Sequence, residues 1–88
     1  MAKRYYRAVL EAASDGFNVF FPDIGGCTSG GEDIADATRN AADALALHLE
    51  DWSGPLPDPS PLNGPIDPEA EPFAIVLVPY EERELALA

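Results

Sequence analysis

Proline dominates one long stretch of this chain, and that stretch limits the possible folds more than any other feature. Seven of the nine prolines in the 88-residue sequence lie within residues 53–72. Because proline has no amide hydrogen to donate and clashes with a helical backbone, neither a helix nor a central strand tolerates this density. Residues 53–72 are therefore predicted to form an extended connection of polyproline character. The apolar residues 73–78 that follow predict a strand, which Pro79 is expected to end.

The start of the chain predicts a β-hairpin. Residues 5–12 alternate with a period of two, which is typical of a strand with one buried face. Residues 14–16, Ser-Asp-Gly, predict a turn, because Asp can bond its own backbone and Gly can take a positive φ. Residues 17–21 then predict the returning strand, which Pro22 is expected to end.

An amphipathic helix is predicted for residues 34–51. Asp33 precedes it as a candidate N-cap, and Asp36 stands where the acid of a capping box would stand. Both residues also place negative charge at the positive end of the helix dipole. The apolar positions recur at helical spacing, at Ile34, Ala37, Ala41, Leu45, Leu49 and Trp52.

These elements predict an α+β fold in a single domain spanning residues 1–88. The order is strand, strand, helix, long connection, strand, and the long connection allows the last strand to lie beside the first. We expect a three-stranded, largely antiparallel sheet covered by one helix, with an additional short strand as an option near residues 27–30. The pattern of residues 81–88 fits a short helical turn and a frayed end equally well.

The chain is strongly acidic. It has 16 Asp and Glu against 5 Lys and Arg, a net charge of −11, and residues 40–82 contain no Lys or Arg. Such a surface repels phosphate, so direct nucleic-acid binding by this chain alone is not expected. The charge fits either a basic partner or a simple role in solubility. No stretch resembles a signal peptide or a membrane span, and the single cysteine fits a reducing compartment, so the expected location is the cytoplasm.

Cys27 and His48 are the one Cys–His pair, and they invite comparison with a nucleophile and its base. We favour a packed cysteine and a partly buried histidine, because the spacing carries no catalytic signal. The glycines around Cys27, in G-G-C-T-S-G-G, suggest a phosphate loop, but its lysine is missing, and tight turns are the better interpretation. One Cys and one His are too few ligands for a metal site, and no cofactor is expected.

Asp23 directly follows a predicted strand, as carboxylates of metal-dependent nucleases often do. Asp15, Glu32 and Asp36 are the acids that would have to join it at a divalent cation. A hydrolase or nuclease of this kind is the alternative hypothesis, and an orphan oligomerisation module is another.

The residues also resemble a known family. The segments Y-Y-R-A-V-L-E-A, D-G-F-N-V-F-F-P-D-I-G-G-C-T-S-G-G-E and D-I-A-D-A-T-R-N-A-A-D-A-L-A-L-H-L-E, followed by P-L-P-D-P-S-P-L, are similar to HicB antitoxins from about Tyr5 to Pro79. The resemblance implies a partial RNase H-like fold without nuclease activity. It further implies a small basic partner, a HicA-like mRNA-cleaving toxin whose active site the antitoxin masks. Relatives commonly continue into a DNA-binding module, which is not expected in residues 1–88.

The leading hypothesis is therefore a non-enzymatic antitoxin-like module that neutralises a HicA-like ribonuclease. Its small core, and a sheet face larger than one helix can cover, predict a homo-oligomer, and the resemblance implies a dimer or a tetramer. The acidic residues expected to contact the toxin are Asp15, Asp23, Glu32, Asp36 and Glu50.

Overall fold

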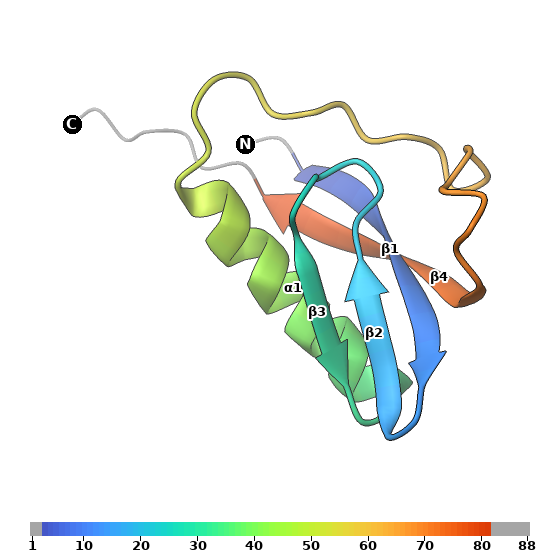
Figure 1. The fold of residues 1–88 in the computed structure, drawn as a ribbon. Helices are drawn as coiled ribbons and strands as arrows, with labels where there is room; N and C mark the ends of the chain where they lie inside the picture. Colours follow the sequence, from blue (N-terminus) through green and yellow to red (C-terminus); the bar gives the residue numbers. More distant parts are fainter. Residues whose placement is uncertain (1–2, 82–88) are drawn as a thin grey trace.

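The computed structural model describes residues 3–81 and contains four strands and one helix (Figure 1). In chain order the elements are β1 (Lys3–Ala13), β2 (Gly16–Phe20), β3 (Thr28–Gly31), α1 (Ile34–Glu50) and β4 (Pro72–Glu81). The predicted α+β class and element order are confirmed. The undecided residues 82–88 lie outside the part of the chain that the structure describes.

The strands form one antiparallel sheet in the order β3-β2-β1-β4. The hairpin is confirmed by the pairing of Leu10 with Val19, and the last strand lies beside the first, with Tyr6 opposite Val78. The sheet contains the three expected strands and a fourth. The optional strand near residues 27–30 is real and is β3, whose sequence T-S-G-G pairs with β2 through its backbone and has no apolar pattern to reveal it.

The strand ends differ from the predicted ones, most clearly at the C-terminus. The first strand extends beyond the predicted residues 5–12 at both ends, and the second begins and ends one residue before the predicted 17–21. Pro79 does not end the last strand, because β4 continues to Glu81 and pairs with β1 throughout, Pro79 opposite Tyr5. β4 is an edge strand, where alternate amides point away from the sheet and a proline removes no ladder hydrogen bond.

The helix begins as its sequence predicts. The Asp33 side chain accepts a 2.7 Å hydrogen bond from the Asp36 amide, and Asp36 in turn accepts one of 3.0 Å from the Glu32 amide. These bonds satisfy backbone donors that have no partner within the helix. The helix ends at Glu50, one residue before its predicted end, and packs a buried stripe on the sheet: Ala37, Ala41, Leu45 and Leu49.

Glycine permits the close contact between the helix and β3. A Cβ atom on Gly31 would collide with the backbone of Ala37, so only glycine fits there. Gly26 has φ 82° and turns the loop between β2 and β3. The prediction that the glycines of this segment serve tight turns is therefore confirmed for Gly26, whereas Gly31 serves close packing within a strand.

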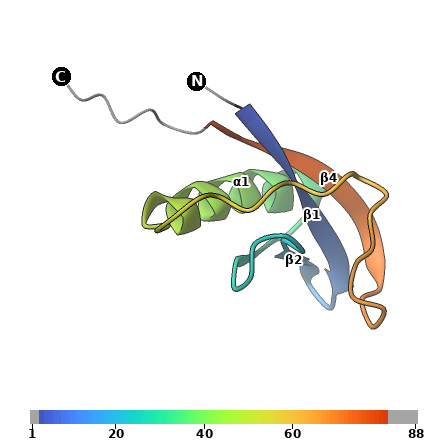
Figure 2. The same cartoon turned by 90° about the horizontal axis from the view of Figure 1, so that it is seen from above.

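The centre of β1 is buried on both faces, contrary to the prediction of one buried face. Residues 6–10 are all buried, although their side chains alternate between the two sides of the sheet. Tyr6, Ala8 and Leu10 belong to the core beneath the helix. Residues 53–71, which we call the strap, leave the end of α1 and cross β1 before the chain enters β4 (Figure 2), and on the other face Gly64 and Pro65 of the strap contact the buried Arg7. Among the described residues, no helix is long and apolar enough to cross a membrane.

Candidate functional site

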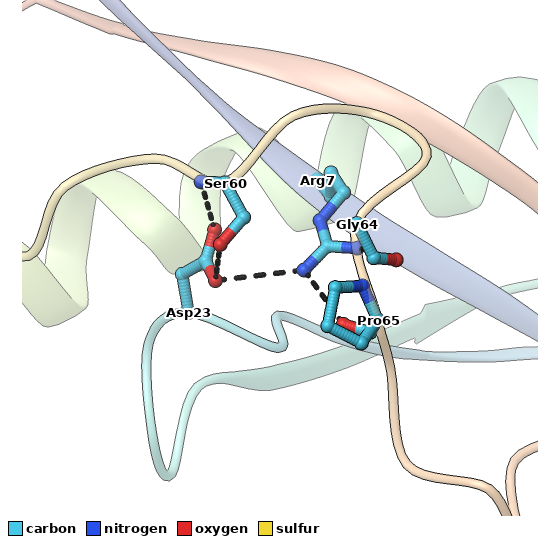
Figure 3. Close-up of polar contacts among 5 residues, drawn as sticks. All are labelled: Arg7, Asp23, Ser60, Gly64 and Pro65. Carbon is cyan, nitrogen blue, oxygen red and sulfur yellow. Dashed lines mark hydrogen bonds and ion pairs between the residues drawn. The ribbon is translucent and has the colours of Figure 1, made fainter.

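A buried arginine joins β1 to the strap. Arg7 is only 1% exposed, and it donates through Nη1 to the Gly64 carbonyl at 2.8 Å and through Nη2 to the Pro65 carbonyl at 3.2 Å. Figure 3 shows the guanidinium between the strap and the loop after β2. A buried charge is costly unless it is paired and hydrogen-bonded, so these contacts explain how a sheet strand accommodates Arg7.

Asp23 supplies the counter-charge and holds a second point of the strap. Its two carboxylate oxygens accept hydrogen bonds from the Ser60 amide and the Ser60 hydroxyl, both 2.7 Å long. Its Oδ1 also lies 3.5 Å from Arg7 Nη2. We call Arg7, Asp23 and Ser60 the clasp (Figure 3), because together they fix the middle of the strap to the sheet.

The clasp keeps Asp23 ionised. Burial opposes its charge, but the Ser60 hydrogen bonds and the nearby Arg7 guanidinium outweigh burial and hold the pKa of Asp23 below its ordinary value. Its side chain is 13% exposed. An ionised carboxylate that already accepts two hydrogen bonds and faces a guanidinium is poorly placed to bind a metal ion.

Two open cavities lie between the strap and the face of the sheet opposite the helix. The larger, of about 470 Å³, lies between the loop after β2 and residues 60–67 of the strap, and Arg7 and Asp23 are in its wall. The smaller, of about 290 Å³, is lined by Glu11, Phe20, Asp67, Glu69 and Ala70. Phe20 and Asp67 line both cavities, so the two adjoin.

The five acids predicted to contact a partner do not form one surface. Asp15 lies in the turn between β1 and β2, and Glu32 and Asp36 lie beside it at the start of α1. Glu50 ends the helix, whose 17 residues span about 25 Å. Asp23 lies in the loop at the far end of β2, so the acids divide between the two ends of the helix (Figure 1).

The same separation bears on the metal-dependent alternative. Asp15, Glu32 and Asp36 do not join Asp23, and residues 3–81 contain no group of three or more potential ligands suited to a metal ion. Asp36 instead accepts hydrogen bonds from the Glu32 amide and from Arg39, the latter 2.7 Å long. These hydrogen bonds outweigh desolvation and lower the pKa of Asp36.

Cys27 and His48 occupy the predicted packing positions. Cys27 is 3% exposed in the core, and burial raises the pKa of its thiol, which disfavours the thiolate needed by a nucleophile. His48 is half-buried, with its ring centroid 5.9 Å from that of Trp52. A Cβ atom on Gly26 would lie 3.8 Å from the His48 ring, so this histidine packs beside the loop after β2.

Sequence reasoning missed Arg7 and Ser60 as structural partners of Asp23. The signal for Arg7 was present, because a lone cation stands among apolar residues in Y-R-A-V-L. Ser60 gave no comparable signal, since serine is common in proline-rich connections. Its partner lies 37 residues away in the sequence.

Comparison with known proteins identifies the family. The family described as HicB_like antitoxin of bacterial toxin-antitoxin system matches residues 5–85. The chain belongs to this family. It is 32% identical over 77 residues to an uncharacterized 14.9 kDa protein of the rep-hol intergenic region of Haemophilus phage HP1 (strain HP1c1), a match that covers 83% of this chain. The resemblance to HicB antitoxins is thereby confirmed.

Solved structures of HicB proteins share the fold. The antitoxin HicB3 is 31% identical with a TM-score of 0.62 over 90% of this chain and 62% of HicB3. A chain of the HicA3 and HicB3 toxin-antitoxin complex is 35% identical with a TM-score of 0.57 over 66% of this chain and 72% of that one. This chain spans 58% of the phage protein and 62% of HicB3, so it corresponds to one part of these longer relatives.

Proposed function

We propose that this chain is an antitoxin that binds a small basic HicA-like mRNA-cleaving toxin and neutralises it by masking its active site. The observation that carries the proposal is the family match over residues 5–85, together with 35% identity to a chain of a HicA3–HicB3 complex. The family also suggests a regulatory, non-enzymatic role in the cytoplasm. We further propose that the sheet and helix represent a partial RNase H-like fold.

The charge of the chain supports a basic partner. With a net charge of −11, the chain would attract a cationic protein and accelerate the encounter. Asp15, Glu32 and Glu50 are exposed and free to contribute to this attraction, whereas Asp23 and Asp36 already hold internal contacts. All five remain proposed contact residues, and the association rate should fall as salt screens exposed charges beyond about 10 Å at 0.1 M.

Co-purification tests the proposal. The chain would be co-expressed with a tagged product of the small basic reading frame beside its gene. The expected result is a stable complex, restored growth of cells that carry the toxin, and loss of mRNA cleavage at equimolar antitoxin. Toxin activity that persists in excess antitoxin would contradict the proposal. In the same assay the antitoxin alone, with Mg²⁺ or Mn²⁺, should leave RNA intact, and cleavage abolished by Asp23→Asn would support the hydrolase instead.

We also propose that the chain forms a homo-oligomer through β4. This edge strand has no charged residue between Glu71 and Glu81, and Leu77 and Tyr5, on one face of the sheet, are 45% and 48% exposed. An uncharged edge strand is a natural site for pairing with a second copy. Light scattering at micromolar concentration should give at least a dimer, and Leu77→Glu should reduce it to a monomer. A monomeric wild-type chain would refute the idea.

A further inference from the structure

Two cavities on the sheet face opposite the helix adjoin at Phe20 and are lined by several acidic residues. Phe20 lies between them, flanked by Glu11 of β1 and by two strap residues, Asp67 and Glu69. Its ring is half-buried, so one part of it faces the groove. We call these four residues and the two cavities they join the acidic groove.

We infer that the acidic groove is the docking site for a basic segment of a protein partner, with an Arg or Lys side chain seated against Phe20. The inference rests on the proposed function only for the identity of that partner. An aromatic ring surrounded by carboxylates attracts a cation twice, through the face of the ring and through the charges. A phosphate or an acidic peptide would be repelled from the same place.

The groove is built before any partner arrives. Glu11 accepts a 2.9 Å hydrogen bond from the Glu71 amide, and Asp67 accepts one of 2.9 Å from the Glu69 amide. Each bond occupies one carboxylate oxygen and restrains the side chain, so two of the three acids of the groove are held. The strap wall is anchored nearby, where Arg7 holds the carbonyls of Gly64 and Pro65. Preorganised groups lose less entropy on binding, which favours affinity.

The local charge is uncompensated. Four carboxylates line the two cavities, those of Glu11, Asp23, Asp67 and Glu69, against the single guanidinium of Arg7. Arg7 is paired with Asp23, which leaves the other three acids to face the groove without a cation among its lining residues.

The chain itself offers few cations to fill the groove of a second copy. Of its five Lys and Arg, Arg7 is buried, Arg39 lies 2.7 Å from Asp36, and Arg4 lies 3.7 Å from Asp58. Because three of these five cations are already in contact with carboxylates, we expect the basic segment to come from another protein.

The test compares two triple variants that change the net charge equally. The groove variant is Glu11→Gln, Asp67→Asn and Glu69→Gln, whose amides keep the oxygen acceptors for the two strap hydrogen bonds. The control variant is Asp43→Asn, Asp51→Asn and Glu81→Gln, all exposed and all outside the groove. Circular dichroism first establishes that both variants fold. A third variant, Phe20→Leu, keeps an apolar side chain and removes the aromatic face.

Two probes are used with each variant. The first is the toxin of the proposed pair, and the second is a hexa-arginine peptide followed by NMR chemical shifts of the antitoxin amides. We expect the groove variant to lose about ten-fold in affinity for both probes, as three weak ion pairs together predict, and Phe20→Leu to lose several-fold. The affinity of the control variant should stay within about two-fold of the wild-type affinity, because salt screens surface charges that lie far from the contact.

The outcomes separate this inference from the proposed function. If the wild type binds the toxin and the groove variant binds it equally well, the groove is not the docking site, although the antitoxin function stands. If the wild type does not bind the toxin, the proposed function fails and the peptide decides: shifts concentrated at Phe20, Asp67 and Glu69 support the groove. Shifts spread evenly over the acidic surface, or absent from the groove, overturn it.

Discussion

Removing the carboxylate of Asp23 should detach the middle of the strap from the sheet. The change Asp23→Ala deletes the acceptor of two 2.7 Å hydrogen bonds from Ser60 and the charge that lies 3.5 Å from the Arg7 guanidinium. A hydrogen bond to a charged group contributes about 1.5–3 kcal/mol, and leaving a buried ion without its partner costs about 3–5 kcal/mol. The two energies are not added together, because both include interactions of the same carboxylate. We therefore expect Asp23→Ala to lower the free energy of unfolding by about 3–5 kcal/mol.

Urea unfolding provides the assay. Trp52 is the single tryptophan, and its indole N–H donates to the Pro55 carbonyl of the strap at 3.2 Å, so its fluorescence reports on the strap. Far-UV circular dichroism reports on the helix and sheet. Ser60→Ala removes the hydroxyl hydrogen bond to the charged Asp23 carboxylate and leaves the ion pair, so a loss of about 1.5–3 kcal/mol is expected. A double-mutant cycle of the two substitutions should give a coupling energy of about 1 kcal/mol or more.

Asp58→Ala is the matched control, because Asp58 is also a strap carboxylate. Its side chain is fully exposed, and it lies 3.7 Å from Arg4, so its removal should change stability by no more than about 1 kcal/mol. If Asp23→Ala costs as little as Asp58→Ala, the clasp does not hold the strap. Additivity of Asp23→Ala and Ser60→Ala within about 0.5 kcal/mol would refute the reasoning equally well.

Three other results are expected. Because the pKa of Asp23 is lowered in the folded state, its contribution is complete above the unfolded value of about 4 and is lost as the pH falls through the folded value. The urea midpoint should thus fall further between pH 7 and pH 3 in the wild type than in Asp23→Asn, and equal decreases would contradict this. Gly31→Ala should destabilise the fold by about 2 kcal/mol or more through its collision with Ala37, whereas Gly25→Ala, with nothing within 4 Å of the new Cβ, should be nearly neutral by thermal melting. The Cys27 thiol should react with a thiol reagent such as DTNB only slowly until urea unfolds the chain, because it is buried and its pKa is raised; rapid reaction of the folded protein would argue against this packing.

The parts of the fold that the sequence predicts are those whose signals are local. The alternation in residues 5–12 and 17–21 and the helical spacing after Asp33 each lie within one element, and the structure confirms a hairpin and a helix there. The cap at Asp33 also follows from neighbours three residues apart. The long connection allows the last strand to lie beside the first, and the structure confirms this predicted pairing between the two ends of the chain.

The parts that the sequence predicts only as an option, or not at all, depend on contacts between distant residues. The strand near residues 27–30 is only an option in the sequence, because Thr28–Gly31 has no apolar pattern and forms β3 by pairing with the backbone of β2. The hydrogen bonds of Arg7 reach carbonyls 57 and 58 residues away. Carbonyl acceptors carry no sequence signature, so no pattern could have revealed these partners. The partner of Asp23 is also not predictable from a pattern. The sequence suggests metal chemistry or partner contact for Asp23, and neither role indicates a hydrogen bond with Ser60.

The strap therefore does more than connect the helix to β4, because it forms part of the second layer of a small domain. It contacts Arg7 on the face of β1 that the helix leaves open, and its prolines reduce the entropy that it loses on folding. It also carries Asp67 and Glu69, two of the acids proposed to bind a basic partner. If the clasp positions these acids, then Ser60→Ala should weaken partner binding. The substitution removes the hydroxyl that donates to Asp23 and so loosens the strap that carries the two acids. The weakening should appear mainly as faster dissociation, because the total charge that governs encounter is unchanged. An unaltered dissociation rate in a folded Ser60→Ala variant would mean that the strap holds its acids in place without the clasp.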